Sequence, residues 1–416
     1  MQKIEDIVWD VVVIGGGPSG MMSAGRSAEL GKKVLLIEKN DSLGKKLLIT
    51  GGGRCNLTNN EPDVRKFLSK FKDSDKFLFS AFSEFSVKET LEFFHNRNME
   101  TKEEALGRVF PASNSAKSVW ETLLEYLKQN KVTINSNSTV MGFETDSGKI
   151  TSIVLKDKTK VTAKSFVLAT GGKSRPETGS TGDGFVWLKE IGHNVIEPSA
   201  SLVPLKTKTD WVKKLQGVSL SDVKITILQN NEKQNQARGK ILFTHFGLSG
   251  PSILNLSHDI GELLKYGEVL VSLDILPNFD HGQLNQKLQD IFKEKSNKKF
   301  KNTLGDLMPS ALVPIVVELS KINPDKPSNS ITREERLSLI ELLKNIHIEV
   351  EDLLGVEKAI VTSGGVSLDE VDFKTMTSRL YSNLYLIGDI LNIDRPSGGY
   401  SLQLCWTTGF IAGSNT

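Results

Sequence analysis

The sequence has little cysteine and lacks any long apolar run. Its two cysteines, Cys55 and Cys405, exclude a framework of several disulfides and are typical of a reducing compartment. No stretch reaches the roughly 18 consecutive apolar residues of a membrane-spanning helix. Residues 1–9 also lack the basic start and apolar core of a signal peptide. We therefore expect a cytoplasmic protein that is not embedded in a membrane.

An excess of charge is missing as well. The chain has 52 basic and 50 acidic residues, a net charge of +2, and no basic extension rich in aromatic residues. This balance favours a small-molecule substrate over nucleic acid. No cluster of His, Cys and carboxylates has metal-ligand spacing, so no metal is expected. Nothing in the sequence indicates an oligomeric state.

A glycine-rich turn near the start of the chain is its most informative feature. The apolar run at residues 10–14 breaks into glycines, and helix-like residues 21–30 follow. Gly15, Gly17 and Gly20 fit the G-x-G-x-x-G pattern of dinucleotide-binding folds. The first glycine permits the sharp turn, the second lets a pyrophosphate approach, and the third lets helix and strand pack closely. The pattern favours a nucleotide site over an ordinary βαβ turn.

Two acidic residues at strand ends predict that the nucleotide is FAD. A strand at 33–37 ends at Glu38, 23 residues after the first glycine, where a carboxylate can accept ribose hydroxyls. A late strand at 384–387 ends in Gly388 and Asp389. This second carboxylate can reach the ribityl hydroxyls, or a water on the pyrophosphate. A domain for NAD alone has no need of this second acid.

Two other glycine segments suit a flavin ring. Gly51–Gly53, followed by Arg54, Cys55 and Asn56, can lay backbone against a flat ligand, although a mobile surface loop is the alternative. Gly398-Gly399 opens an apolar helix, whose N-terminus can stabilise the negative charge of a reduced flavin. The alternative is a helix that only completes the core.

The chain is long enough for two or three domains. Short strands separated by turns predict a β-meander at residues 132–135, 139–145, 150–155 and 160–162. From about residue 198, strands alternate with polar loops and helices follow, without a second dinucleotide motif. A strand at 359–366 then runs into glycines, as the strand at residues 10–14 does. We predict an FAD-binding domain in two parts, 1–197 (with the meander) and 346–416, around an inserted substrate or cap domain at 198–345.

Five runs resemble, in order, the motifs of BaiN-like (YhiN-type) NAD(P)/FAD-dependent flavoproteins: residues 50–59, 169–174, 179–184, 242–251 and 398–403. The resemblance implies an α/β fold with a discontinuous, glutathione-reductase-like FAD-binding Rossmann domain and an inserted mixed β-barrel-like and helical domain. One family member is linked to reduction of conjugated double bonds in bile-acid intermediates. The chain departs from the family at Gly52, where Asn is frequent, at Asp389, where Glu is common, and at Ser401, where Asn is usual. All three positions are expected beside the flavin, so these departures bear on its reduction potential and on the identity of the substrate more than on whether FAD is bound.

We expect FAD to contact residues of the glycine turns, strand ends and helix starts: Gly15, Gly17, Pro18, Ser19, Gly20, Glu38, Lys39, Lys46, Gly53, Arg54, Cys55, Asn56, Val140, Thr170, Gly171, Gly172, Gly388, Asp389, Gly399, Tyr400, Ser401 and Leu402.

Three residues are candidates for catalysis. His245 can donate a proton to the substrate, or it is a hydrogen-bonded hinge histidine. Arg54 can neutralise an anionic substrate or the reduced flavin, or it is a surface arginine. Tyr400 can donate a proton or only cover the ring. Cys55 is expected to pack against the flavin, because no C-x-x-C pair supplies a resolving thiol.

The predicted function is that of a flavin-dependent oxidoreductase. NAD(P)H, as a transient co-substrate, reduces FAD, which passes hydride to an unsaturated or carbonyl small molecule. The alternatives are an FAD-dependent amine or amino-ketone oxidase that uses oxygen, a flavin-dependent RNA-modifying protein, and a non-enzymatic flavin-binding sensor.

Overall fold

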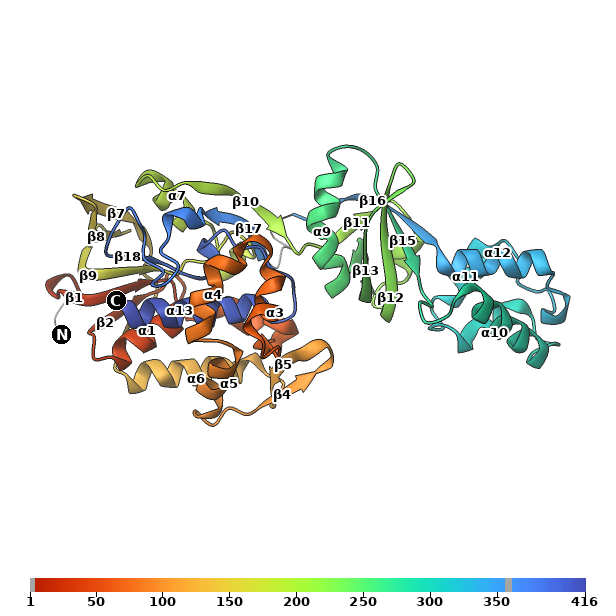
Figure 1. The fold of residues 1–416 in the computed structure, drawn as a ribbon, viewed down its shortest axis with the longest axis horizontal. Coiled ribbons are helices and arrows are strands. Elements are labelled where there is room, and N and C mark those ends of the chain that lie inside the picture. Colours follow the sequence, from red (N-terminus) through yellow and green to blue (C-terminus); the bar gives the residue numbers. More distant parts are fainter. Residues whose placement is uncertain (1–3, 356–360) are drawn as a thin grey trace. The chain divides into compact units, whose positions relative to one another are not determined.

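The chain divides into two compact units in its structure, a computed structural model that describes residues 4–355 and 361–416 (Figure 1). Unit 1 comprises the described residues up to Ser201 and from residue 361 onward, and unit 2 comprises Leu202–Gly355. Unit 2 extends beyond residue 345 because strand β16 (Ile346–Leu353) pairs with β11 (Leu205–Thr207) and β15 (Leu270–Asp274). Of the strand predicted at 359–366, β17 covers Val361–Val366, and residues 359 and 360 lie outside the described residues.

The core of unit 1 is a parallel sheet. Its strands run in the order β6 (Thr133–Asn135), β2 (Val34–Ile37), β1 (Trp9–Ile14), β9 (Lys160–Leu168) and β18 (Leu384–Leu386). The placement of 132–135 in the meander was wrong. β6 follows helix α6 (Ala116–Gln129) and pairs parallel with β2, as strands joined through a crossover helix do.

The meander grows directly out of this sheet. The first part of β9 pairs antiparallel with β8 (Lys149–Leu155), and β8 pairs with β7 (Val140–Asp146). From Ala163 to Leu168 the same strand pairs parallel with β1. The strand predicted at 160–162 is therefore the first part of a longer strand, β9, which serves both the meander and the parallel sheet.

Helices α1 (Pro18–Glu29) and α13 (Tyr400–Asn415) lie side by side in unit 1 (Figure 1). Their backbones approach closely, because a Cβ at Gly409 would lie 2.5 Å from the Ser19 carbonyl oxygen and one at Gly413 would lie 2.6 Å from that of Ser23. The remaining elements of unit 1 are α2 (Lys45–Ile49), α3 (Val64–Leu68), α4 (Asp75–Glu84), α5 (Val87–His95), α7 (Asp183–Glu190), the small sheet β3 (Thr58–Asn59), β5 (Arg108–Pro111) and β4 (Thr101–Glu104), and the pair β10 (Val195–Ser201) and β17.

Unit 2 is built on a closed barrel, as predicted for the insert. The strand order is β11, β14 (Gly247–Ser249), β13 (Glu232–Phe243), β12 (Ser219–Gln229), β15 and β16. Alternate residues of β12, among them Val223, Ile225 and Ile227, are fully buried. Helices α8 (Trp211–Lys214), α9 (Pro251–Leu264), α10 (His281–Glu294), α11 (Val313–Ser320) and α12 (Arg333–Lys344) complete the unit.

Candidate functional site

A pocket opens in unit 1 where parallel strands end. The carboxyl ends of β1, β2, β9 and β18 meet at one edge of the sheet, the usual ligand position in open α/β folds. Its walls come from Gly15–Ser19, Glu38–Asn40, Ala169–Gly171 and Asp389, together with Thr178–Asp183. The space between them that protein atoms do not fill, open solvent at the mouth included, is about 1200 Å³.

The glycine turn supplies the phosphate-binding geometry. Gly15 has a φ of +106°, and a Cβ there would lie 2.5 Å from the Ala169 carbonyl oxygen. A Cβ at Gly20 would lie 1.9 Å from the Gly15 carbonyl oxygen, so Gly20 packs helix against strand. A Cβ at Gly17 would meet nothing within 4 Å. Gly17 is the N-cap of α1 without a side-chain capping bond, so the first amides of α1 are available to an anion in the pocket.

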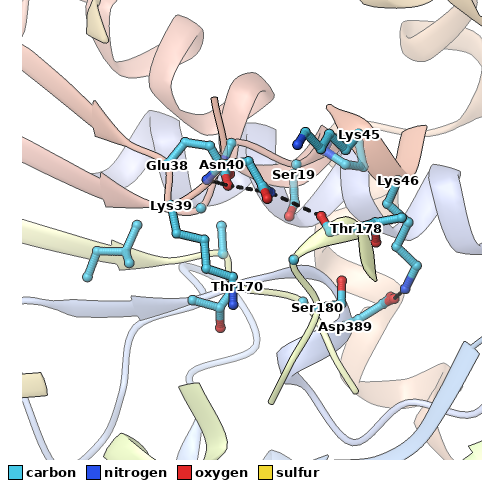
Figure 2. Close-up of a pocket in the computed structure, with 18 of the residues that line it drawn as sticks. Ser19, Glu38, Lys39, Asn40, Lys45, Lys46, Thr170, Thr178, Ser180 and Asp389 are labelled. Atoms are coloured by element: carbon cyan, nitrogen blue, oxygen red, sulfur yellow. Dashed lines mark hydrogen bonds and ion pairs between the residues drawn. The ribbon is translucent and has the colours of Figure 1, made fainter. Parts of the chain in front are cut away.

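Glu38 is held in place by backbone and amide donors at one end of the pocket. Its carboxylate accepts hydrogen bonds at 2.8 Å each from the Gly16 amide, the Asn40 amide and Asn40 Nδ2. Asn40 also donates to the Thr178 carbonyl oxygen at 3.1 Å, as Figure 2 shows. A carboxylate has about four lone-pair sites, so Glu38 keeps room for a hydrogen bond from a ligand hydroxyl.

Lys39 bridges the pocket next to Glu38. Its ammonium pairs with Asp183 Oδ2 at 2.8 Å and also donates to the Thr181 hydroxyl. Asp183 opens α7, so the end of β2 is tied to the start of that helix. Together with the Asn40–Thr178 bond, this bridge fixes the 178–183 loop against the pocket.

Charged side chains form the other end of the pocket. Lys46 reaches toward Asp389 with 3.8 Å between Nζ and Oδ2 (Figure 2). The same carboxylate is bonded to Arg395, whose side chain is fully buried. Burial alone would raise the pKa of Asp389, but the charges of Arg395 and Lys46 outweigh it and lower the pKa. Burial lowers the pKa of Lys46.

These residues fit FAD. The α1 amides suit a pyrophosphate, Glu38 suits a ribose, and the space beyond Gly17 admits a ligand. Thr170, which also lines the pocket, has a buried Oγ1 without a hydrogen-bond partner. A buried hydroxyl without a partner is costly, so a ligand that bonds to it would remove that cost.

Comparison with known proteins agrees with this geometry. Residues 9–415 match the model of the HI0933-like protein Rossmann domain. The chain belongs to the HI0933-like family. A 3-dehydro-bile acid delta(4,6)-reductase of Clostridium scindens is 31% identical over 96% of this chain and 97% of its own length. A ribosomal RNA dihydrouridine synthase of Escherichia coli is 30% identical over 97% of this chain and 96% of its own length.

The fold has solved counterparts. The structure of 3-ketosteroid delta1-dehydrogenase from Sterolibacterium denitrificans matches with a TM-score of 0.56 at 14% identity, covering 98% of both chains. The HI0933-like chain is therefore an enzyme, a flavin-dependent oxidoreductase with an FAD-binding Rossmann fold. Within residues 4–355 and 361–416, no helix is both long and apolar enough to cross a membrane, and no group of three His, Cys or carboxylate side chains could hold a metal ion.

Many of the residues expected to contact FAD line the pocket of this HI0933-like chain: Gly15, Gly17, Pro18, Ser19, Glu38, Lys39, Lys46, Val140, Thr170, Gly171, Asp389, Ser401 and Leu402. The others do not line it: Gly20, Gly53, Arg54, Cys55, Asn56, Gly172, Gly388, Gly399 and Tyr400.

Several of the residues outside the lining support it from behind. A Cβ at Gly388 would lie 2.7 Å from Ser19 Oγ, and one at Gly399 would lie 2.3 Å from the Thr58 backbone. With its amide oriented to satisfy both ends, Asn56 accepts a hydrogen bond from the Gly399 amide at 3.0 Å and donates to the Thr58 carbonyl oxygen at 3.1 Å. These contacts hold the start of α13, which carries Ser401 and Leu402 into the pocket.

The candidate catalytic residues of unit 1 are engaged elsewhere. Arg54 forms two bonds to Glu104, at 2.8 and 3.1 Å, and stacks on the Phe110 ring. The bond to Glu104 raises the pKa of Arg54, so the guanidinium keeps its positive charge, which Glu104 balances. Tyr400 packs in an aromatic cluster, 4.8 Å from the Phe67 ring, and burial raises its pKa.

Both thiols are buried. Cys55 is fully buried, and burial raises its pKa to about 12. Cys405 lines the pocket, and burial raises its pKa to about 12 as well. Thiols with such values remain protonated near pH 7, so neither suits thiolate chemistry.

His245 lies in unit 2, exposed in the turn between β13 and β14. The turn is closed by the Thr244 amide, which donates to the Gly247 carbonyl oxygen at 2.8 Å, and by the Thr244 hydroxyl, which accepts from the Gly247 amide at 3.1 Å. The His245 ring itself contacts the Phe246 ring edge-on.

Sequence reasoning missed a set of lining residues: Gly16, Asn40, Gly44, Ser138, Thr139, Thr178, Trp187 and Cys405. The run 179–184, by contrast, was singled out by its motif, and it lines the pocket as far as Asp183. Some of the missed residues carried a signal. Asn40 follows the end of a strand, and Cys405 stands one helical turn after Ser401.

Proposed function

We propose that this enzyme uses NAD(P)H to reduce its FAD and then reduces a carbon–carbon double bond conjugated to a carbonyl group in a small molecule. The observation that carries the proposal is the likeness of nearly the whole chain to two relatives with related chemistry. The names of both describe the addition of hydrogen to a ring double bond next to a carbonyl group. The chemistry that they share is hydride transfer to an electron-poor alkene.

In this proposal the residues of unit 1 hold and orient the cofactor. The α1 amides bind its phosphates, Glu38 binds the adenosine ribose, and Asp389 binds the ribityl chain. FAD, when bound, supplies the hydride transfer. Gly52 and Gly53 have positive φ values, and a Cβ at either position would meet no atom within 4 Å, so backbone there suits close contact with a flat ring.

Proton delivery is assigned to His245. Reduction of a conjugated double bond needs a proton at the carbon next to the carbonyl group. Arg54 and Tyr400 are unsuited to this task, because Arg54 is ion-paired and Tyr400 is packed among aromatic rings with a raised pKa. His245 is exposed, and an imidazole is the side chain that most often serves as a general acid.

Anaerobic stopped-flow spectroscopy tests the proposal. The FAD-loaded protein is first mixed with NADH or NADPH, and loss of the oxidised flavin absorbance is recorded. The reduced enzyme is then mixed with a conjugated steroid dienone, with a small cyclic enone or with oxygen. We expect rapid reoxidation by an enone and slow reoxidation by oxygen. Fast reoxidation by oxygen alone would instead indicate an oxidase.

A second candidate substrate is uridine in ribosomal RNA, favoured by the name of the relative from Escherichia coli. The same reduced enzyme is mixed with ribosomal RNA transcripts, and dihydrouridine is measured by mass spectrometry. Flavin reoxidation that depends on RNA, with no response to enones, would favour this candidate over the first.

A further inference from the structure

Arg395 is a buried cation that no dinucleotide motif contains. Its guanidinium uses all three nitrogens: Nη2 bonds to Asp389, Nη1 donates to the Ile393 carbonyl oxygen at 2.7 Å, and Nε donates to Ser401 Oγ at 3.1 Å. Asp389 and Ser401 both line the pocket of unit 1, whereas Arg395 does not. Arg395, which lies outside the pocket lining, thus fixes the positions of two lining side chains.

Because Arg395 bonds to Asp389, the Lys46 ammonium does not form a hydrogen bond to that carboxylate. Asp389 is bonded to Arg395, and its other oxygen stays 3.8 Å from Lys46 Nζ, beyond hydrogen-bond distance. Within the part of the chain that the structure describes, the hydrogen bond of Lys46 goes to Ser174 Oγ at 2.7 Å. An ammonium has three donors, so Lys46 retains capacity to bond to a ligand in the pocket.

We propose that Arg395 is a positioning residue that neutralises Asp389 and thereby leaves the Lys46 ammonium free to bind negative charge on the cofactor. Two cations face one carboxylate, so the three side chains together carry one positive charge when all are ionised. Reduced flavin carries more negative charge than oxidised flavin, and a nearby positive charge therefore favours the reduced form. The inference requires only that the pocket binds FAD, and it is independent of the electron donor and acceptor proposed above.

The net charge of Arg395, Lys46 and Asp389 predicts how substitutions change the flavin reduction potential. Arg395→Met leaves Asp389 to pair with Lys46, and the cluster becomes neutral. A unit charge at roughly 10 Å in a medium of effective dielectric about 20 changes an equilibrium about tenfold. We therefore expect Arg395→Met to lower the affinity for reduced FAD, relative to oxidised FAD, about tenfold, which corresponds to a fall of about 30 mV in the two-electron potential.

Removing a second residue should restore the potential. Arg395→Met combined with Asp389→Asn frees Lys46 again and returns the single positive charge. Lys46→Met should lower the potential as much as Arg395→Met, because it also leaves a neutral cluster. Arg395→Lys keeps the charge, but a single nitrogen cannot reach the three acceptors that the guanidinium spans, so the potential should stay near that of the wild type while FAD binds more weakly.

The measurement uses the full-length protein freed of flavin and titrated with FAD, followed by spectroelectrochemical reduction with mediator dyes. Arg97→Met is the matched control, because Arg97 is a half-buried arginine of unit 1 that stacks on Phe93 and Tyr126 and does not line the pocket. An unchanged potential in both Arg395→Met and Lys46→Met would overturn the inference. So would a double variant whose potential stays as low as that of the single one.

Arg395→Met alone could fail to fold, because it removes the partner of a buried carboxylate. The double variant Arg395→Met/Asp389→Asn has no such carboxylate, and its thermal melting shows whether it folds. If it folds and binds FAD while its potential stays low, Arg395 is only structural. A wild-type protein that binds no FAD would overturn the cofactor assignment itself. FAD binding without reaction with NAD(P)H or enones would contradict only the proposed function.

Discussion

Unit 1 and unit 2 differ in how their polar side chains are used. In unit 1, carboxylates and cations are buried and bonded around a pocket, as Glu38 and Arg395 illustrate. In unit 2, the candidate His245 is exposed on a turn that is closed by Thr244 and Gly247. The difference predicts that substitutions around the pocket of unit 1 change FAD affinity, whereas a substitution at the exposed His245 leaves the buried bonds of both units intact.

The largest effect expected from unit 2 is on substrate reduction. His245→Gln should leave flavin reduction by NAD(P)H intact and slow reoxidation by the enone about 10²-fold or more, because proton transfer from a positioned side chain contributes that much. The two half-reactions are measured separately by stopped flow. His258→Gln in helix α9 of the same unit is the control. Equal slowing of both half-reactions would assign His245 a structural role. It would contradict the expectation that a substitution at this exposed residue affects substrate reduction alone.

The largest effect expected from unit 1 is on FAD binding. Glu38→Gln should weaken FAD binding ten- to a hundredfold, since charge-assisted hydrogen bonds contribute about 1.5–3 kcal/mol. Isothermal titration of the flavin-free protein gives the affinity. Glu121→Gln on α6, whose side chain is exposed and pairs with Lys117, serves as the control. Unchanged FAD affinity would mean that another residue binds the ribose.

Two glycines of the same turn should separate binding from stability. Gly17→Ala places a methyl group in the open space of the pocket, so it should weaken FAD binding about tenfold while the flavin-free protein melts normally. Gly20→Ala places the methyl group 1.9 Å from the Gly15 carbonyl oxygen and should lower the melting temperature even without FAD. Differential scanning fluorimetry with and without FAD compares them. Equal destabilisation by both would contradict the open position of Gly17.

The smallest expected effect is a loss of stability of unit 1 at acidic pH. His193 is buried in unit 1 between Glu370 and Ser378, and burial lowers its pKa below the ordinary 6.5. The unfolded chain then binds a proton that the folded chain does not, so unit 1 should lose stability as pH falls below about 6.5. The described histidines of unit 2, by contrast, are not buried. Hydrogen exchange of each unit at pH 7 and pH 5.5 checks this, and His193→Gln should remove the dependence.

Local motifs allowed one end of the pocket to be predicted. The turn at Gly15–Gly20 and the acid at Glu38 lie in one strand–turn–helix–strand segment, where spacing along the chain fixes spacing in the fold. Asp389 was found in the same way, because it follows a strand end. Its partner Arg395 was not, because a single arginine in a loop carries no pattern, and only the fold shows that a buried carboxylate stands beside it.

Strand pairing and long-range contacts account for the other differences. The sequence around residues 132–135 predicts a strand but does not identify its partner, which lies almost a hundred residues earlier in β2. Helix α9 was overlooked because it begins at Gly250-Pro251, a pair typical of turns, although Pro is well placed in the first turn of a helix. The motif at 179–184 was recognised in the sequence, but the bonds that tie it and the preceding Thr178 to Lys39 and Asn40 join residues far apart in the chain, which no local pattern predicts.

The order in which the strands are joined has a consequence for how the protein is made. The sheet that begins with β1 is completed by β18 and covered by α13, which both follow unit 2 in the sequence, whereas unit 2 is a single continuous segment. On the ribosome, unit 2 can fold as soon as it has emerged, while unit 1 must wait with an open sheet edge. Asp389 and Ser401 can reach the pocket only after the whole of unit 2 has been synthesised. We therefore expect a nascent chain stalled before β18 to fold its barrel and bind no flavin.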